Sequence, residues 1–307
     1  MKPTVCGRFY DKYIIAYRSG SDKGAIISKD VFDVLSKLSA ENAIIPNQLM
    51  VFLKKLGVST DPFQKINDVV HVIPLTELFF GSVSYEITEK CNYKCRHCIF
   101  GDKKETRDLP IIDKLRLIET IRRAGCMYLR ITGGEPLLAS GFKDVYSLAF
   151  LLGMIVKIQT NGSLLIENKN QKIFEKYPPH KIVISVYGGS KKSYQSLTRT
   201  DGSFDHFLEA VKWLKKSRIL VRANIIVTQY NEHEIDKMVN MIKEAGFEYF
   251  IYPKLNPTFY GDSSPMSLMA HNCLIAEEIN RYNQESTPES DKNKGYAKCL
   301  AGKAFFM

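Results

Sequence analysis

Three cysteines fall within eight consecutive positions of the stretch EKCNYKCRHCIFG, which spans residues 89–101. They are Cys91, Cys95 and Cys98, and their spacing is C-x3-C-x2-C. Thiolates this close in sequence typically bind a metal or take part in redox chemistry. The next cysteine, Cys126, follows 28 residues later at the start of a predicted buried strand, where a small core residue is expected.

Four interpretations of these cysteines compete. A zinc site usually has four protein ligands at paired spacing, and only three thiols are present here. A role as small buried residues is disfavoured, because Lys94, Arg96 and His97 separate the thiols. A redox C-x2-C pair would leave the first cysteine unexplained. A [4Fe–4S] cluster held by three thiolates accounts for all of them and leaves one iron open to bind a further molecule.

The elements that must position the cysteines alternate between strand and helix from residue 82 onward. Apolar, β-branched strands are predicted at residues 82–88, 127–132, 154–160, 181–186, 219–227 and 249–253, and helices at 115–125, 142–152, 165–176, 204–217 and 234–246. This alternation predicts an α/β fold with a parallel sheet, either open and doubly wound or a partial or full barrel. Ligands of such sheets lie at the carboxyl ends of the strands, where both the cysteine loop and the turn GGEP are placed.

The first 75 residues follow a different pattern of short strands and two helices. Strands are predicted within residues 4–17 and 24–28, around the turn RSGSDKG, and at 69–75. Ser28 is the predicted N-cap of a helix over 28–39, and Gly57 ends a second helix over 46–57. Such a unit suits a winged-helix fold. We therefore predict three parts: a winged-helix-like domain over 1–80, an α/β domain over 81–257, and a remaining segment over 258–307.

Composition limits the function classes. The chain has 307 residues, of which 45% are hydrophobic and 25% charged, as in soluble globular proteins. It contains no run of about 18 apolar residues and no apolar signal-peptide core, so a cytoplasmic location without membrane contact is expected. The net charge of +10 is compatible with nucleic acid, an acidic peptide or an anionic cofactor. Nucleic acid is disfavoured, because the lysines are scattered and no stripe of alternating arginine and aromatic residues is present.

Together, the cysteine motif after the first strand and GGEP after the second resemble the radical S-adenosylmethionine (radical SAM) superfamily. The resemblance covers about residues 82–252, and His97 stands where the family typically has an aromatic residue. It implies that the α/β domain over 81–257 is a partial (β/α)6 TIM-like barrel. It implies that Cys91, Cys95 and Cys98 hold a [4Fe–4S] cluster whose open iron is chelated by the amino and carboxylate groups of SAM. The reduced cluster then cleaves SAM to methionine and a 5′-deoxyadenosyl radical, which abstracts a hydrogen atom from the substrate.

The GGEP turn, Gly133, Gly134, Glu135 and Pro136, is expected to contact SAM. Glycine lets a backbone approach a ligand closely, so that carbonyl groups of the turn can accept hydrogen bonds from the SAM ammonium group. The Glu135 carboxylate can add a charge-assisted contact. A GGEP sequence alone would be read as an ordinary strand-to-helix turn.

Four further residues are candidates for SAM binding at the strand ends. Thr160 belongs to QTNG at the end of the third strand of this sheet, and Ser185 matches a family position that contacts SAM. Arg199 resembles the arginine that holds the SAM carboxylate, although a surface arginine is the alternative. Asn224 is a polar residue inside the apolar strand ILVRANIIV, and either the SAM ribose or the backbone is its expected partner.

The stretch SVYGGSKKSYQSLTRTDGSFDHFLEAVKWLK resembles the branch of the family that carries a SPASM domain with auxiliary iron–sulfur clusters. Cys299 in CLAGKAFFM looks like the first residue of that domain and is a possible auxiliary ligand. The further cysteines of the pattern are missing, so an auxiliary cluster is doubtful. Residues 258–307 are expected to be a linker and the start of a C-terminally truncated SPASM domain. Cys273 is predicted to be a core thiol.

The resemblance implies a peptide-modifying enzyme. Residues 1–80 would bind the leader of a ribosomally synthesised precursor peptide as an added strand, and the barrel would install a crosslink, an epimerised residue or an oxidised side chain. An electron donor such as flavodoxin or ferredoxin would reduce the cluster. Two alternatives are a radical SAM enzyme acting on RNA or a cofactor precursor, and an inactive scaffold that binds peptides.

Overall fold

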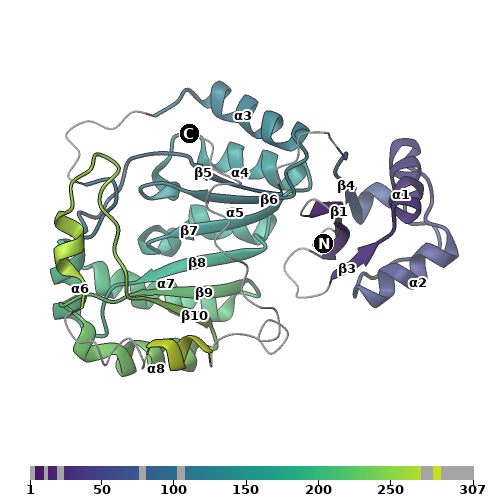
Figure 1. The fold of residues 1–307 in the computed structure, drawn as a ribbon. Coiled ribbons are helices and arrows are strands. Elements are labelled where there is room, and N and C mark those ends of the chain that lie inside the picture. Colours follow the sequence, from purple (N-terminus) through teal and green to yellow (C-terminus); the bar gives the residue numbers. More distant parts are fainter. Residues whose placement is uncertain are drawn as a thin grey trace. The chain divides into compact units, whose positions relative to one another are not determined.

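A computed structural model describes residues 4–9, 13–18, 24–75, 81–101, 108–270 and 279–284 of the chain (Figure 1). The chain forms two compact units, each drawn from separate stretches of sequence. One unit comprises Met1–Lys90, Arg107–Gln159 and Asn168–Ile182, and the other comprises Cys91–Thr106, Thr160–Glu167 and Val183–Met307. The predicted domain limits near residues 80 and 257 stay predictions.

The N-terminal module is a four-stranded sheet in the order β3-β2-β1-β4. Its strands are β1 (Thr4–Phe9), β2 (Tyr13–Arg18), β3 (Gly24–Ile27) and β4 (Val70–Val72). The first three strands pair antiparallel, and β4 pairs parallel to β1. Between β3 and β4 the chain forms α1 (Lys29–Glu41), α2 (Asn47–Lys55) and a short 3-10 turn (Ile66–Asp68).

Local chemistry explains both helix boundaries that were predicted in this module. The Ser28 hydroxyl accepts a hydrogen bond from the Val31 N–H at 3.3 Å and caps α1. Gly57 follows α2 with φ of 77°, a left-handed conformation that glycine adopts without strain. The module has its own core, built from Ala16, Ile27, Phe32, Leu35, Ile45, Met50, Leu53, Leu56, Val58, Ile66, Val69 and Val70. Its assignment to the winged-helix class stays a prediction.

Six strands form the second sheet in the order β10-β9-β8-β7-β6-β5, so strands that follow one another in the chain are neighbours. They are β5 (Ser82–Glu86), β6 (Tyr128–Thr132), β7 (Ile155–Thr160), β8 (Lys181–Val186), β9 (Leu220–Ile226) and β10 (Glu248–Tyr252). The registers of β5 with β6, β6 with β7, and β9 with β10 are parallel. The predicted α/β fold with a six-stranded parallel sheet is confirmed, and it is consistent with a partial TIM-like barrel.

The helices that follow the strands agree with the predicted alternation, with one addition. They are α3 (Ile111–Arg123), α4 (Phe142–Leu151), α5 (Asn168–Lys176), α6 (Lys191–Thr198), α7 (Ser203–Lys216) and α8 (Ile235–Ala245) (Figure 1). α6 is not among the predicted helices, because its eight residues are mostly polar. It begins with a capping box between Ser190 and Ser193 and buries only a short apolar stripe that includes Tyr194 and Leu197. No helix in the described ranges is long and apolar enough to cross a membrane.

Within the first unit, the N-terminal module contacts the start of the large sheet. Ile73 lies in a buried cluster with Met127 and Ile155, which begin or precede β6 and β7. The Arg122 guanidinium donates hydrogen bonds to the carbonyls of Val72 and Leu152, both at 2.8 Å. The module is therefore joined to the sheet by apolar contacts and by a side chain that satisfies backbone groups of both parts.

Candidate functional site

The loop that carries the three cysteines begins after β5 and is held by the end of α6. The backbone N–H of Lys94 donates to the Thr198 carbonyl at 3.1 Å, and that of Arg96 donates to the Leu197 carbonyl at 2.9 Å. The last carbonyls of a helix have no partner within the helix, so the loop satisfies groups that would otherwise need water. α6 therefore positions the cysteine loop.

The three thiols lie close enough together to influence one another. Cys91 is exposed, whereas Cys95 and Cys98 are half-buried. Burial raises the pKa of Cys95 well above its ordinary value, and the neighbouring charges of Cys91 and Cys98 raise it further. Three thiolates that repel one another in this way are stabilised when cations bind between them.

A small polar network surrounds the first cysteine. The Asn161 amide donates to Cys91 Sγ at 3.9 Å, and the Tyr93 backbone N–H donates to the same sulfur at 3.4 Å. The same amide donates to Asn92 Oδ1 at 3.0 Å, while Asn92 donates to Ser163 Oγ at 2.8 Å. Donors directed at a sulfur favour its thiolate form and fix its orientation. Sequence reasoning missed this network, although Asn92 lies within the cysteine motif and Asn161 within QTNG.

His97 lies in an aromatic environment. Its ring centroid is 5.2 Å from that of Tyr187, and Tyr187 also contacts Tyr93 and Tyr194. Burial lowers the pKa of His97 to about 4, so the imidazole is neutral at physiological pH. Its Nδ1 atom is buried and has no hydrogen-bond partner in the described part of the chain. None of these tyrosines was predicted as a site residue. Tyr93 lies within the cysteine motif, whereas Tyr187 and Tyr194 are far from His97 in the sequence and gave no local signal.

The GGEP turn is shaped by contact with the backbone that precedes the cysteines. Gly133 has φ of 137°, and a Cβ atom there would lie 2.2 Å from the Thr88 carbonyl oxygen. A Cβ on Gly134 would lie 2.3 Å from the Lys90 carbonyl oxygen. The N–H groups of Gly134 and Glu135 donate to the Thr88 and Lys90 carbonyls at 2.8 and 2.7 Å. Both glycines are therefore required for backbone packing, a reason that the sequence interpretation did not include.

The charged side chain of the turn is buried. Glu135 has 0% exposure, and its Oε1 atom accepts a hydrogen bond from the Leu137 N–H at 3.2 Å. This bond caps the 3-10 turn Pro136–Leu138, in which Pro136 supplies the first residue and needs no donor partner. A capping role for the Glu135 carboxylate thus accompanies the expected contact with SAM.

Two of the candidate residues at the strand ends, Thr160 and Ser185, are buried and take part in local hydrogen bonds. The Thr160 hydroxyl accepts from the Gly162 N–H at 3.0 Å and shapes the turn after β7. Ser185 is 9% exposed, and its side chain hydrogen-bonds to Tyr187. Ser185 is therefore connected to the aromatic group beside His97.

The other two candidates have unusual features. Arg199 is the exposed C-cap of α6 and has φ of 51°, a left-handed conformation that side-chain-bearing residues adopt only at a cost. Asn224 lies on β9, and its Oδ1 atom is buried without a hydrogen-bond partner among the described atoms. A buried acceptor without a donor is rare in folded proteins and indicates a ligand or water contact.

The three thiols of the cysteine loop suit an iron–sulfur cluster, because each thiolate can bind a different iron. Cys126 is fully buried and its thiol donates to the Tyr128 carbonyl at 3.0 Å, which confirms it as a core residue. Cys273 and Cys299 lie outside the described residues.

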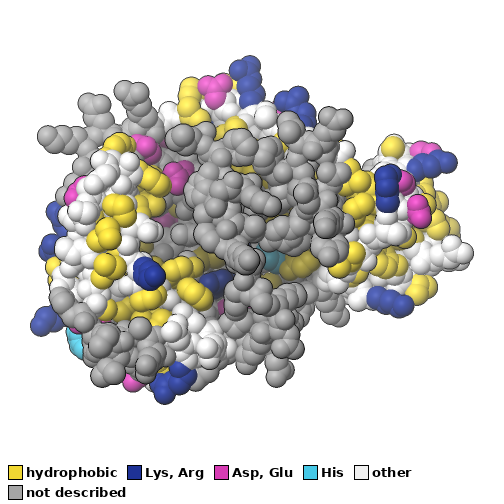
Figure 2. Space-filling view, in the orientation of Figure 1, with side chains coloured by type: hydrophobic (Ala, Val, Ile, Leu, Met, Phe, Trp, Pro, Cys, Tyr) yellow, Lys and Arg dark blue, Asp and Glu magenta, His cyan; other side chains and the backbone are white. Residues whose placement is uncertain are grey.

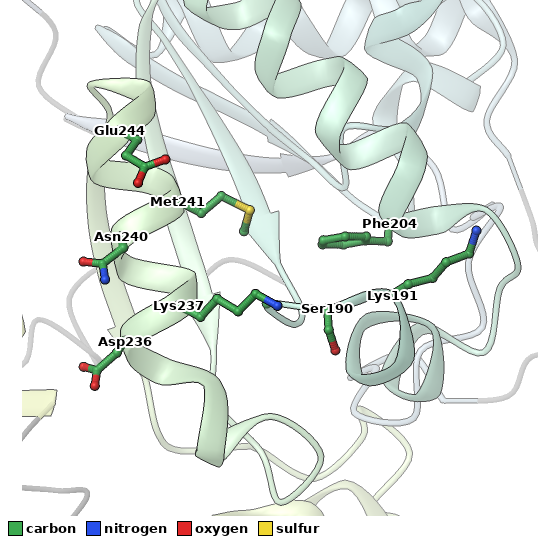
Figure 3. Close-up of a pocket in the computed structure, with 9 residues that line it drawn as sticks. Ser190, Lys191, Phe204, Asp236, Lys237, Asn240, Met241 and Glu244 are labelled. Atoms are coloured by element: carbon green, nitrogen blue, oxygen red, sulfur yellow. The ribbon is translucent and has the colours of Figure 1, made fainter.

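A groove of about 740 Å³ lies between α8 and the starts of α6 and α7. It is lined by Gly189, Ser190, Lys191, Phe204, Asp236, Lys237, Asn240, Met241 and Glu244. In Figure 3, Lys237 points towards Ser190, and Met241 points towards Phe204. The Ser190 hydroxyl already accepts from the Ser193 N–H at 3.3 Å, so the helix start is capped. The groove contains none of the candidate site residues.

Comparison with known proteins relates the chain to one family. A model of the radical SAM superfamily matches residues 85–242, just over half of the chain. The AdoMet-dependent heme synthase of Methanosarcina barkeri is 25% identical over 184 residues, which are 59% of this chain and 52% of that protein. The GTP 3′,8-cyclase of Staphylococcus carnosus is 27% identical over 178 residues, which are 53% of this chain and 50% of that protein. The subtilosin biosynthesis protein AlbA of Bacillus subtilis is 25% identical over 171 residues, which are 55% of this chain and 38% of AlbA.

Solved structures show the same fold. SuiB of Streptococcus suis bound to S-adenosylmethionine matches with a TM-score of 0.61 and 15% identity, covering 90% of this chain and 67% of SuiB. The structure of SuiB bound to its precursor peptide SuiA matches with a TM-score of 0.62 and 14% identity, covering 92% of this chain and 69% of SuiB. The chain spans about half or less of the length of the curated relatives named above. The matched region contains the cysteine loop and the GGEP turn, and the chain therefore belongs to the radical SAM superfamily, whose members use a [4Fe–4S] cluster and S-adenosylmethionine.

Proposed function

We propose that the chain is a radical SAM enzyme that modifies a ribosomally synthesised peptide. The observation that carries the peptide assignment is the N-terminal module, a separate four-stranded sheet whose β3 edge pairs with no described strand and lies beside exposed apolar side chains. The module accompanies a cysteine loop suited to a cluster, so that one chain would combine a peptide-binding surface with a radical-generating site.

Cys91, Cys95 and Cys98 would hold the cluster. When bound, the reduced cluster supplies the electron that cleaves SAM and generates a 5′-deoxyadenosyl radical. Asn161 orients Cys91 through its hydrogen bond to the sulfur. The His97 ring packs against the buried Tyr187 ring and would help to hold the loop in place.

The residues that would bind SAM are supported by separate features of the structure. The left-handed backbone of Arg199 keeps a costly conformation, as residues at functional sites do, and its guanidinium can pair with the SAM carboxylate. The buried Asn224 Oδ1 can accept a hydrogen bond from a ribose hydroxyl. Ser185, Thr160 and the carbonyls of the GGEP turn would complete the contacts.

The peptide leader would add to the edge of the N-terminal sheet. β3 is the last strand in the order β3-β2-β1-β4, and its other edge has no partner among the described strands. Ile26 on β3 is 69% exposed, and Val31 and Val34 on α1 are 39% and 55% exposed. Figure 2 shows hydrophobic side chains on the surface of the module that carries α1 and α2. An extended peptide satisfies an open edge through its backbone and places alternate side chains against apolar neighbours.

The likeness to AlbA, a protein of bacteriocin biosynthesis, supports a peptide substrate. The likeness to heme synthase and to GTP 3′,8-cyclase supports a second candidate, a radical SAM enzyme acting on a cofactor precursor. A peptide-modifying enzyme would need the N-terminal module to bind its substrate, whereas an enzyme acting on a cofactor precursor would not. In either case a one-electron donor such as flavodoxin or ferredoxin would reduce the cluster.

The test begins with anaerobic reconstitution of the full chain. About four irons per chain and dithionite-driven formation of 5′-deoxyadenosine are expected for one [4Fe–4S] cluster. Short peptides encoded beside the gene are then added, and their binding and mass change are measured with and without residues 1–75. Deletion of residues 1–75 should weaken peptide binding and spare uncoupled SAM cleavage. Turnover of a porphyrin or a nucleotide, without any peptide modification, would favour the second candidate.

A further inference from the structure

The turn that follows β10 contacts the cysteine loop just beyond its last thiol, and both segments belong to the second compact unit. The Phe259 N–H donates a hydrogen bond to the Ile99 carbonyl at 2.8 Å. The Phe259 and Phe100 rings pack edge to face, with their centroids 5.4 Å apart and their planes at 66°. A Cβ atom on Gly101 would lie 3.4 Å from Thr258 Cγ2. Three successive residues of the loop therefore lie against two successive residues of the turn.

The turn is held in shape by its own hydrogen bonds. The Thr258 N–H donates to the Asp262 carbonyl at 2.8 Å, and the Asp262 N–H donates to the Thr258 hydroxyl at 3.0 Å. Gly261, with φ of 84°, closes the turn by donating its N–H to the Thr258 carbonyl at 3.0 Å. The Asp262 carboxylate accepts from the N–H and the hydroxyl of Ser264 at 2.9 and 2.7 Å. These bonds fix the backbone that carries Phe259.

Backbone bonds connect this contact to the third cysteine. The Gly101 N–H donates to the Cys98 carbonyl at 3.0 Å, and the Cys98 N–H donates to the Cys95 carbonyl at 3.2 Å. Phe100 lies between the two turns that these bonds form and is 8% exposed, so its ring anchors this part of the loop. A restraint on residues 99–101 therefore restricts the backbone that carries the Cys98 thiol.

The exposure of Phe259 distinguishes this contact from ordinary core packing. Phe259 is 61% exposed, so its burial contributes little to the stability of the whole fold. The bonds from Lys94 and Arg96 to the end of α6 restrain the part of the loop that precedes the last cysteine. The contact with Phe259 restrains the part that follows it. The loop is thus held on both sides of Cys98.

We propose that Phe259 is a positioning residue that holds the cysteine loop beyond Cys98 and keeps the third thiol oriented for binding the cluster. The proposal rests on the cluster site assigned above and adds a residue from a turn that belongs to none of the motifs. Phe259 acts through Ile99 and Phe100. Loss of its ring loosens the loop while the rest of the fold stays intact.

The test compares Phe259→Ala with Phe259→Tyr, which keeps the ring, and with Phe63→Ala. Phe63 lies in the N-terminal module and is 81% exposed, so it is a matched control for the loss of an exposed ring. Thr258→Val keeps the shape of the side chain but removes the hydroxyl that closes the turn, and it loosens the turn by a second route. The first readout is hydrogen exchange in the cluster-free full chain, for peptides covering residues 92–101 and, as a reference, α8. The second is release of iron to a chelator after reconstitution.

Phe259→Ala should raise hydrogen exchange in residues 92–101 and speed iron release by about tenfold, as changes in groups that orient metal ligands typically do. Thr258→Val should act in the same direction with a smaller effect. Phe259→Tyr and Phe63→Ala should match the wild type, and exchange in α8 should not change in any variant.

Unchanged exchange in residues 92–101 of Phe259→Ala, or unchanged iron release, would overturn the proposal. An equal rise of exchange in α8 would also overturn it, because the effect of the ring would then be on the whole fold. A wild-type chain that binds no cluster would refute the proposed function. The exchange of the cluster-free chain would still show whether Phe259 holds the loop.

Discussion

The cysteine loop leaves its reactive side chains accessible, whereas the GGEP turn buries its charged side chain. Cys91 is exposed and the other two thiols are half-buried, but Glu135 has 0% exposure. The loop carries the thiols, and the turn packs the backbone of its two glycines against residues 88–90. The difference indicates that the loop acts through side chains and the turn through its backbone shape.

Removing a thiol should have the largest effect on activity. Cys95→Ala should reduce SAM cleavage to background, because a three-thiolate site loses a ligand that no neighbour replaces. The matched variant Cys126→Ala removes a buried thiol that is not in the loop, and it should keep full iron content and cleavage. Iron, labile sulfide and 5′-deoxyadenosine measured on both proteins check this prediction. Continued 5′-deoxyadenosine formation by Cys95→Ala would remove the loop from the cluster site.

A methyl group on the GGEP backbone should have the next largest effect. The Cβ of Gly134→Ala would lie 2.3 Å from the Lys90 carbonyl oxygen, and it should lower the free energy of unfolding by about 3 kcal/mol. Gly246 has φ of 75°, and a Cβ atom there would meet no described atom within 4 Å, so Gly246→Ala should cost about 1.5 kcal/mol from backbone strain alone. Urea denaturation of both variants measures the difference. Equal losses would mean that the turn tolerates a side chain and that its backbone shape is not the essential feature.

Loss of the amide beside Cys91 should weaken cluster retention without abolishing it. Asn161→Ala removes the donor to Cys91 Sγ and its bond to Asn92, and iron release to a chelator should become about tenfold faster. Asn240→Ala removes an exposed amide on α8 and is the control. Indistinguishable release rates would show that the loop orients its thiols without the polar network.

The smallest effect is expected for the buried carboxylate of the turn. Glu135→Gln keeps an oxygen that can cap Leu137, so the free energy of unfolding should fall by about 1 kcal/mol or less. If the turn acts through its backbone, the KM for SAM should stay within about twofold of the wild-type value. A much larger rise in KM, with kcat unchanged, would show that the carboxylate itself contacts SAM and would break the contrast between the two motifs.

Much of the architecture follows from local sequence. The alternation of apolar strands and amphipathic helices predicts the six-stranded sheet. Ser28 marks the start of a helix by its hydroxyl, and Gly57 marks the end of another by its freedom to adopt a positive φ. The cysteine spacing identifies the loop itself. These features are readable because each depends on residues within a few positions of one another.

Other features depend on contacts between distant segments. α6 is polar and short, and its role becomes visible only where its last carbonyls accept the amides of Lys94 and Arg96. Lys114 precedes the predicted helix start at residue 115 and looks like an ordinary solvated lysine until the fold surrounds it. The glycines of GGEP suggest contact with a ligand, whereas their nearest contacts are the carbonyls of Thr88 and Lys90. Periodicity carries no information about such pairings.

The attachment of the cysteine loop to the end of α6 also has a consequence for the entropy of cofactor binding. Fixing the backbone of one residue costs about 1–2 kcal/mol of chain entropy. In this chain that cost is met during folding for Lys94 and Arg96, whose N–H groups donate to the carbonyls of Thr198 and Leu197. A cluster that binds to residues already fixed in this way does not lose this free energy again, and its affinity is higher than for a disordered loop with the same three thiols.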